Sequence, residues 1–272
     1  MRRSAPAILT ALWVLTIHMV LLASSAPVAR HLRVHATDWP KGAPTQRLVL
    51  LSDLHVSTPG DSVARLAGTI ARVNTLHPDL VVITGDFVST GTLAVRSAGV
   101  QKATAPLAAI RARLGTVAIF GNHDYYDDGL NAELRAWLPA RGITLIENQA
   151  IRRGPFALIG LGDAYTHHAR PQLALNAAHN IGGWPILLTH GPDIVTHIPN
   201  IGGLVLTGHT HCGQIVLPVV GAPYVPSAHK RYRCGVVQDG PRVSITTAGL
   251  GVSNLPFRLG ASPDYWVVDV GP

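Results

Sequence analysis

Five short polar segments carry the residues best suited to metal chemistry, and each follows an apolar stretch. In chain order they read Asp53-Leu54-His55, Gly85-Asp86, Gly121-Asn122-His123-Asp124, Thr189-His190 and Gly208-His209-Thr210-His211. Together they offer carboxylate oxygens, an amide oxygen and imidazole nitrogens. Such mixed oxygen and nitrogen ligands suit Mn, Fe or Zn. Two ions that share a carboxylate can clamp the attacking and leaving oxygens of a phosphoryl displacement.

Two of these segments place ligand-type side chains two positions apart. They are the D-x-H of residues 53–55 and the H-x-H of residues 209–211. On an extended backbone, side chains two apart face the same way. Each pair is therefore predicted either to hold one ion or to straddle two.

The apolar stretches before these segments predict buried strands that alternate with helices. Strands are expected at 47–51, 80–84, 117–120, 156–160, 185–189 and 204–207, and helices at 61–76, 95–114 and 130–141. Short strands are expected later at 214–217, 233–237, 243–246 and 266–270. Such alternation is typical of an α/β fold with a largely parallel first half. In these sheets functional groups gather at the carboxyl ends of the strands.

The ordered set of five segments resembles the calcineurin-like metallophosphoesterase superfamily over residues 47–211. This resemblance implies an α/β fold, a four-layer αββα sandwich of two mixed sheets. It also implies hydrolysis of a phosphate ester or anhydride by a metal-bridging hydroxide. Here one N-terminal hydrophobic helix is expected to precede the fold.

The family pattern, carried over position by position, implies a centre of two divalent metal ions. One ion would be held by Asp53, His55, Asp86 and His211, and the other by Asp86, Asn122, His190 and His209. His123 would be the catalytic residue, which stabilises the phosphate or protonates the leaving oxygen. Asp124 would support this loop and its hydrogen bonds.

Three further stretches, 208–214, 231–235 and 249–258, resemble a membrane-linked bacterial subgroup. That subgroup contains phosphodiesterases and UDP-2,3-diacylglucosamine pyrophosphatase-like enzymes that act on lipid-linked or cell-envelope substrates. The chain departs from the pattern at Cys212, where glycine is usual, and at Pro263-Asp264, where Pro-Glu is usual. Arg258 in the last stretch either holds a substrate phosphate or has a structural ion-pairing role.

Residues 1–29 contain an apolar run long enough to span a bilayer as a helix. It is either an uncleaved signal anchor or a signal peptide cut near residues 23–26. Pro27 and the length of the run favour the anchor. The protein is therefore expected at the bacterial inner membrane. Its orientation stays open because arginines flank the run on both sides: Arg2, Arg3, Arg30 and Arg33.

Residues 30–46 are expected to form an irregular linker, and residues 47–272 one metallophosphoesterase domain. The net charge of +7 favours anionic partners. Because the basic residues are scattered, no nucleic-acid partner is expected. The subgroup resemblance implies a phosphorylated small-molecule or lipid-linked substrate. Cys212 and Cys234 can form one disulfide or none.

Two other classes of function fit the same residues. A nucleotide phosphodiesterase or nuclease shares the chemistry, but the chain has no basic stripe. A metal-bound scaffold or sensor without turnover need not keep His123 beside a complete ligand set. The favoured hypothesis is a dinuclear metal-dependent phosphohydrolase that cleaves a phosphodiester or pyrophosphate near a membrane.

Overall fold

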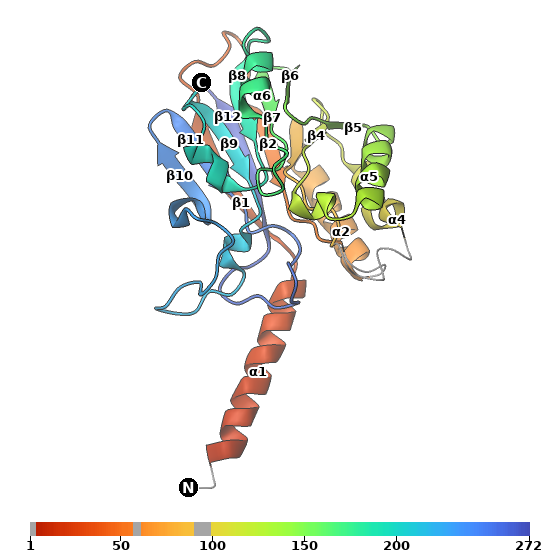
Figure 1. Cartoon of the computed structure of the whole chain (residues 1–272), viewed down its shortest axis with the longest axis vertical. Coiled ribbons are helices and arrows are strands. Elements are labelled where there is room, and N and C mark those ends of the chain that lie inside the picture. Colours follow the sequence, from red (N-terminus) through yellow and green to blue (C-terminus); the bar gives the residue numbers. More distant parts are fainter. Residues whose placement is uncertain (1–3, 57–60, 90–98) are drawn as a thin grey trace.

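Two six-stranded sheets form the body of the protein (Figure 1) in a computed structural model that describes residues 4–56, 61–89 and 99–272. The first sheet has the order β1-β12-β2-β3-β4-β5, and the second β10-β11-β9-β8-β7-β6. The first comprises β1 (Val28–His35), β12 (Asp264–Gly271), β2 (Gln46–Leu51), β3 (Leu80–Ile83), β4 (Thr116–Ala118) and β5 (Ile143–Leu145). The second comprises β10 (Gly235–Asp239), β11 (Arg242–Thr246), β9 (Gly203–Thr207), β8 (Trp184–Leu188), β7 (Phe156–Gly160) and β6 (Gln149–Arg153).

Parallel pairing dominates both sheets and brings the strand ends together. Strands β2 to β5 are parallel neighbours, as are β7, β8, β9 and β11. Antiparallel pairs join β12 to β2, β10 to β11 and β6 to β7. Both sheets are therefore mixed, and the carboxyl ends of the central strands in each sheet lie along one edge.

The main core lies between the two sheets. In β2, Leu48 and Leu50 point into this layer, where they join Leu204 and Leu206 of β9. The alternate residues of β2 point to the opposite face, as the period of two of a strand requires. A strand buried on both faces explains why β2 reads as a continuous apolar run.

Helices cover the outer face of each sheet. Helices α2 (Asp61–Thr75), α4 (Val100–Thr104) and α5 (Asp128–Ala140) pack on the first sheet, and α6 (Pro171–Ala178) packs on the second. In α2, Leu66, Ile70 and Val73 recur at helical spacing and are buried. The expected αββα sandwich is confirmed.

Short 3₁₀ turns connect several strands and helices. They are η1 (Ala105–Ala109), η2 (Asn122–Tyr125), η3 (Pro192–Thr196), η4 (His211–Gly213) and η5 (Lys230–Tyr232). Two of them, η2 and η4, contain residues of the polar segments. Each of the two is separated from a strand by only three residues, η2 from β4 and η4 from β9, so the polar side chains stay near the strand ends.

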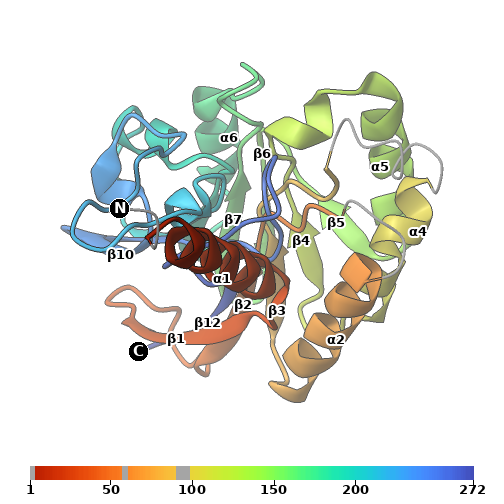
Figure 2. The same ribbon diagram turned by 90° about the horizontal axis from the view of Figure 1, so that it is seen from below.

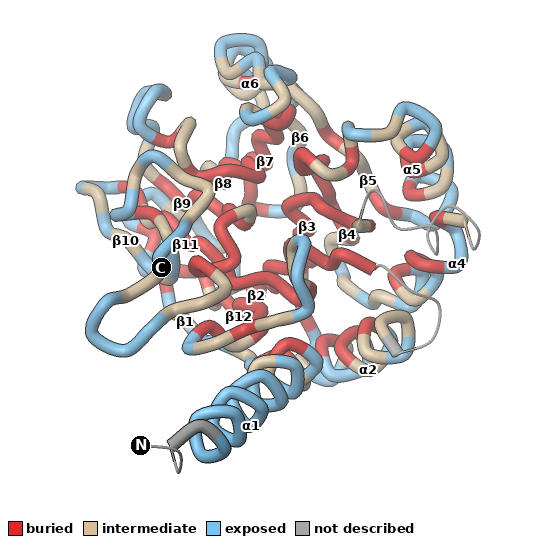
Figure 3. Tube along the Cα trace, turned by 60° about the horizontal axis from the view of Figure 1, so that its bottom comes forward, coloured by how far each residue is buried: buried red, intermediate tan, exposed pale blue. Residues whose placement is uncertain are grey.

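Helix α1 (Ser4–Ser24) projects away from the domain and is exposed along most of its length (Figures 1 and 3). Residues Pro6–Ser24 are long and apolar enough to cross a membrane. Its C-terminal end meets the domain. There the Met19 carbonyl accepts the Arg258 amide at 3.1 Å, and the Ala23 carbonyl accepts the Arg65 guanidinium at 2.8 Å.

The expectation of an irregular linker over residues 30–46 is corrected by β1. This strand pairs in parallel with β12 from Val28 opposite Asp264 to His35 opposite Gly271. As an edge strand it is mostly exposed, so it shows no apolar run. Its partner lies at the other end of the chain, and no local pattern signals that pairing.

The helix expected over residues 95–114 is shorter in the structure. Residues 95–98 lie outside the described part, α4 ends at Thr104, and the η1 turn contains Pro106. Proline lacks the amide hydrogen that a continuing helix needs. The strand expected at 214–217 is reduced to isolated bridges at Ile215 and Leu217. The elements β5, β6 and α6 were not expected.

Candidate metal centre

The five polar segments meet at one edge of the sandwich, as the parallel strand order requires. Those after β2, β3 and β4 come from the first sheet, and those after β8 and β9 from the second. Backbone hydrogen bonds connect segments that are distant in sequence: the amide of Asp53 donates to Gly85 at 3.0 Å, and that of Gly208 to His190 at 2.9 Å. The centre therefore lies between the two sheets.

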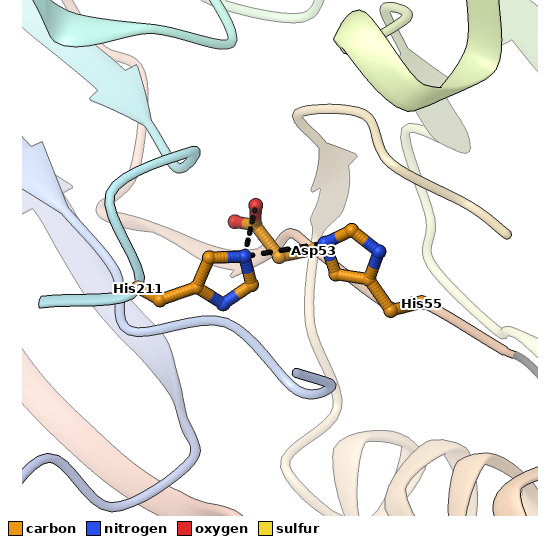
Figure 4. A group of neighbouring side chains, drawn as sticks. All are labelled: Asp53, His55 and His211. Carbon is orange, nitrogen blue, oxygen red and sulfur yellow. Dashed lines mark hydrogen bonds and ion pairs between the residues drawn. The ribbon is translucent and has the colours of Figure 1, made fainter. Parts of the chain in front are cut away.

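Asp53, His55 and His211 form the first group of ligand atoms (Figure 4). The Nε2 atoms of His55 and His211 lie 3.2 Å apart, and His211 Nε2 lies 3.5 Å from Asp53 Oδ1. Ligands about 2.1 Å from one shared ion lie roughly 3.0–3.4 Å from each other in octahedral or tetrahedral geometry. The spacing of this group fits one ion.

Asn122, His190 and His209 form a second group. Asn122 Oδ1 lies 3.1 Å from His190 Nε2 and 2.9 Å from His209 Nδ1. His190 Nδ1 lies 2.7 Å from the Thr84 carbonyl oxygen. A hydrogen bond there directs the other ring nitrogen toward the centre, an arrangement common among metal-binding histidines.

Asp86 belongs to both groups. Its Oδ2 lies 3.3 Å from His55 Nε2 and 3.2 Å from His190 Nε2, while its Oδ1 accepts the His123 amide at 2.9 Å. A single carboxylate within reach of both groups is what a bridging ligand requires. The arrangement fits a dinuclear centre, and its mixed donors do not select one metal.

Burial sets the protonation of the ligands. It raises the pKa of Asp53 to about 6, and it lowers the pKa of His55 to about 3 and of His209 to about 4. Desolvation disfavours the charged form of each group. His55 and His209 are therefore neutral at pH 7, the form in which imidazole binds metals.

Asp86 and His190 behave as a pair. Burial opposes charge on both, yet neighbouring His190 holds the pKa of Asp86 well below its usual range, and Asp86 raises the pKa of His190. The pair thus holds a proton between its carboxylate and imidazole. Metal binding would displace this proton, since ligands must be deprotonated to bind.

The backbone at the centre adopts an uncommon conformation. Asp53, His55, Asp86, His209 and His211 all have positive φ, between 42° and 67°. Few non-glycine residues occupy this region, and strained residues cluster at functional sites. The assumption of extended D-x-H and H-x-H segments is therefore wrong. Tight turns bring Asp53 and His55 into one group, whereas His209 and His211 enter different groups.

Two motif glycines are required because ligands press against the backbone. A Cβ on Gly121 would lie 2.3 Å from Asp86 Oδ1, and one on Gly208 would lie 2.2 Å from Asp53 Oδ2. Both distances are too short for any side chain. These glycines let the carboxylates approach the neighbouring segments closely.

Asp124 supports the loops around Asp86. It is fully buried and accepts the backbone amides of Asp86, Phe87 and Gly121 at 2.8–2.9 Å. Burial, with nearby Asp86, raises its pKa to about 8. Because its oxygens face amides, Asp124 fixes the position of the bridging residue.

Arg258 is fully buried behind the centre. Its guanidinium donates to the carbonyls of Ala248, Gly251 and Ala261, and one nitrogen lies 3.5 Å from His211 Nδ1. These contacts match a structural role, made through carbonyl oxygens. The buried guanidinium does not line the cavity, so it is not placed to bind a substrate phosphate there.

The ligand groups open into a cavity of about 380 Å³. Its walls include Tyr126 and Tyr165, both exposed. The Tyr126 hydroxyl accepts the Asn122 amide at 2.9 Å, and the Tyr165 ring lies 5.2 Å from that of His209. Tyr165 belongs to the segment Gly162-Asp163-Ala164-Tyr165 after β7, and the sequence singled out no aromatic residue there as part of the cavity wall.

Cys212 and Cys234 form a disulfide, with their Cα atoms 4.7 Å apart. The bond ties the segment of His209 and His211 to the start of β10. Close by, the Thr210 hydroxyl donates to the Arg233 carbonyl at 2.6 Å. The last polar segment is thus fixed covalently and by hydrogen bonds.

Known proteins resemble this chain in sequence or in fold. Residues 46–213 match the calcineurin-like phosphoesterase family. The phosphodiesterase YaeI of Escherichia coli is 31% identical over 82% of each chain. A transmembrane protein with metallophosphoesterase domain from Danio rerio is 29% identical over 90% of this chain and 58% of its own length. A dimetal phosphatase from Danio rerio shares the fold with a TM-score of 0.52 at 12% identity, over 79% of this chain and 90% of its own.

The chain belongs to the calcineurin-like phosphoesterase family. It is a metallophosphoesterase, a hydrolase whose buried aspartates and histidines cluster as a metal site requires.

Replacing the shared carboxylate should empty the centre. Wild-type protein is expected to bind two ions per chain, and Asp86→Ala fewer than one, because neither group keeps its full ligand set. Plasma mass spectrometry of purified protein measures this stoichiometry. Asp38→Ala, at an exposed loop aspartate, should keep both ions. Two bound ions in Asp86→Ala would contradict a shared role.

Removing the Asp124 carboxylate should destabilise the loops around Asp86. Asp124→Ala leaves three buried amides without an acceptor, at a cost of about 1–3 kcal/mol for each unsatisfied group. A clearly lower thermal midpoint and weaker metal retention are expected by calorimetry and metal analysis. An unchanged midpoint would show that the amides find other acceptors.

Proposed function

We propose that this metallophosphoesterase cleaves a phosphodiester or pyrophosphate bond with two divalent ions, on a substrate associated with a membrane or cell envelope. The observation that carries the proposal is the position of Asp86, shared by two ligand groups at the inner end of a cavity. The Escherichia coli relative is named a phosphodiesterase, which supports a diester substrate.

The residues that would hold the ions are Asp53, His55, Asp86 and His211 in one group, and Asp86, Asn122, His190 and His209 in the other. When bound, two divalent ions lower the pKa of a water molecule and offset the charge on phosphoryl oxygens. Asn122 is oriented for this task, because its amide nitrogen donates to Tyr126 and its oxygen faces the histidines.

His123 is placed to act on the substrate. It lines the cavity and is partly exposed, and its ring packs edge-on against that of His55 with centroids 4.8 Å apart. Burial lowers its pKa, so at neutral pH it donates a hydrogen bond through one ring nitrogen. From this position the neutral ring would donate a hydrogen bond to a phosphoryl oxygen, whereas passing a proton to the leaving oxygen would require the protonated imidazolium form.

Helix α1 supports a location at the membrane, as an anchor that stays with the mature protein. Its Met19 and Ala23 carbonyls accept hydrogen bonds from Arg258 and Arg65 of the domain. Cleavage near residues 23–26 would remove the Met19 acceptor and leave the Arg258 amide unsatisfied. The Danio rerio relative is also named as a transmembrane protein.

The disulfide supports a catalytic domain on the oxidising side of that membrane. Disulfides persist outside the cytoplasm and are rare inside it. The domain would then face the cell envelope, where the anchor places it beside lipid-linked phosphates.

Manganese, iron and zinc all suit the donor set.

Loss of the His123 imidazole should slow hydrolysis without emptying the centre. His123→Ala is expected to lower turnover of bis(4-nitrophenyl) phosphate with Mn²⁺ by about 10²–10⁴-fold, the usual contribution of an acid–base group. Both ions should remain. His179→Ala, at an exposed histidine of the second sheet's outer layer, is the matched control. An equal loss of turnover in both variants would show that His123 has no specific role in the reaction.

A screen of substrates tests the class of bond. Full-length protein in detergent with Mn²⁺ should hydrolyse diesters and nucleotide-sugar pyrophosphates faster than monoesters. Faster release of phosphate from monoesters would overturn the proposed bond class and leave the family assignment intact.

The side of the membrane can be tested through the cysteines. Protein taken from its native membrane and denatured without reductant should give no reaction with a thiol reagent. After reduction, two thiols should appear, from Cys212 and Cys234. Two free thiols before reduction would contradict a location on the oxidising side.

A further inference from the structure

Exposed apolar side chains gather on the segment between β9 and β10. Val219 is fully exposed, Val220 is 74% exposed and Tyr224 is 73% exposed. Leu217 nearby is also exposed. Single exposed apolar residues are ordinary on a soluble protein, but a group of them marks a contact surface.

The backbone presents these side chains at the end of a tight loop. Leu217 and Gly221 exchange two backbone hydrogen bonds of 2.9 Å, so residues 218–220 form the tip. Val219 has φ 66°, a conformation that a β-branched residue adopts at a cost. Glycine or asparagine would form this turn more easily. The turn therefore does not account for valine, whereas an apolar contact at the tip does.

A second loop, residues 252–258, is hydrogen-bonded to residues 214–216, which lead into this tip. The Gln214 side chain donates to the carbonyls of Ser253 and Leu255 at 3.1 Å, and its oxygen accepts the Ser253 amide at 3.0 Å. The Val216 amide donates to the Leu259 carbonyl at 2.7 Å. Leu255 adds a side chain that is 55% exposed.

The second loop lies beside the apolar helix α1. The Arg258 amide meets the carbonyl of Met19, five residues before the end of α1 at Ser24. At 1.5 Å per residue, Met19 lies about 7.5 Å along the helix from that end. This depth is close to the thickness of one headgroup layer of a bilayer, about 5–7 Å. If α1 spans a membrane, this loop lies at its surface.

The two loops and α1 occupy the same end of the molecule. Figure 1 shows the light-blue loop between β9 and β10 extending from the end of the domain from which α1 projects. Figure 2, viewed from that end, shows the light-blue segments and α1 both facing the viewer. Helix α6 lies at the opposite end in Figure 1.

The same loops form the outer wall of the cavity. Ile215, Pro223 and Tyr224 line it from the first loop, and Asn254 and Leu255 line it from the second. Its inner wall is formed by metal-centre residues, among them Asp86, Asn122 and His211. One set of loops thus faces the metal centre on one side and the surroundings of α1 on the other.

We propose that residues 217–221 and Leu255 form a membrane-contacting surface that seats the mouth of the cavity on the phospholipid bilayer holding α1. The apolar tip enters the interface, where Tyr224 suits the headgroup level. The Arg233 guanidinium lies near Gly221 and is placed to meet lipid phosphates. A phosphorylated amphiphile then reaches the centre from the bilayer, its phosphate toward the ions and its apolar part along Leu255 and Tyr224.

This surface rests on the proposed function in one respect, since it assumes that α1 is a membrane anchor. It can be tested on the full-length protein in vesicles of phosphatidylcholine with brominated acyl chains, which quench nearby tryptophan. Trp13 of α1 is first replaced by phenylalanine, because it would itself be quenched. Val220→Trp then reports on the loop tip, and Leu173→Trp, at an exposed leucine of α6, is the matched control.

The added tryptophan of Val220→Trp should lose roughly half its emission in brominated vesicles, because an interfacial side chain lies at the boundary of headgroups and acyl chains. The added tryptophan of Leu173→Trp should lose little. Similar quenching at both positions, whether weak or strong, would contradict the proposed membrane-contacting surface. Val219→Trp, at the other exposed tip residue, replaces Val220→Trp if that variant does not retain its ions.

This measurement does not depend on turnover. Quenching at the tip without hydrolysis in the substrate screen would reject the proposed reaction and keep the membrane-contacting surface. Hydrolysis without quenching at the tip would reject the surface and keep the reaction.

Discussion

The structure depends on a single carboxylate, that of Asp86, which serves two groups of ligands at once. A buried carboxylate is costly unless partners of opposite charge surround it. Asp86 meets this condition through the charged His190 imidazole 3.2 Å away, and the neutral ring of His55 lies 3.3 Å away on the other side. Its backbone amide is held by Asp124, and its Oδ1 by the amide of His123. Each neighbouring segment is therefore positioned relative to this residue.

The packing of the two sheets brings these segments together around Asp86. The ligands from the first sheet follow β2, β3 and β4, and those from the second sheet follow β8 and β9. Neither sheet alone holds both groups, so the centre exists only when the sheets are packed. The apolar layer between them, with Leu50 and Leu206 among its members, thus supports the metal centre as well as the fold.

Most of the central strands and the metal ligands could be predicted, because the patterns that mark them are local in the sequence. Buried strands read as apolar runs, and the polar segments that end them locate the ligands. Strand β1 could not be found in this way, since it is an exposed edge whose partner β12 lies more than 200 residues away. The turns at Asp53 and His55 were also missed, because positive φ at a non-glycine residue leaves no clear pattern. The Cys212–Cys234 bond required the folded chain, which brings two Cα atoms within 4.7 Å.

Arg258 contacts both helix α1 and the metal centre. Its amide hydrogen bonds to Met19 of α1, and its guanidinium lies 3.5 Å from the ring of His211. A tilt of α1 relative to the domain would therefore act on a residue that also supports a ligand of the metal centre. If α1 is the proposed membrane anchor, a mismatch between its apolar length and the bilayer thickness would change its tilt. The lipid environment would then have a mechanical route to the geometry of the metal centre.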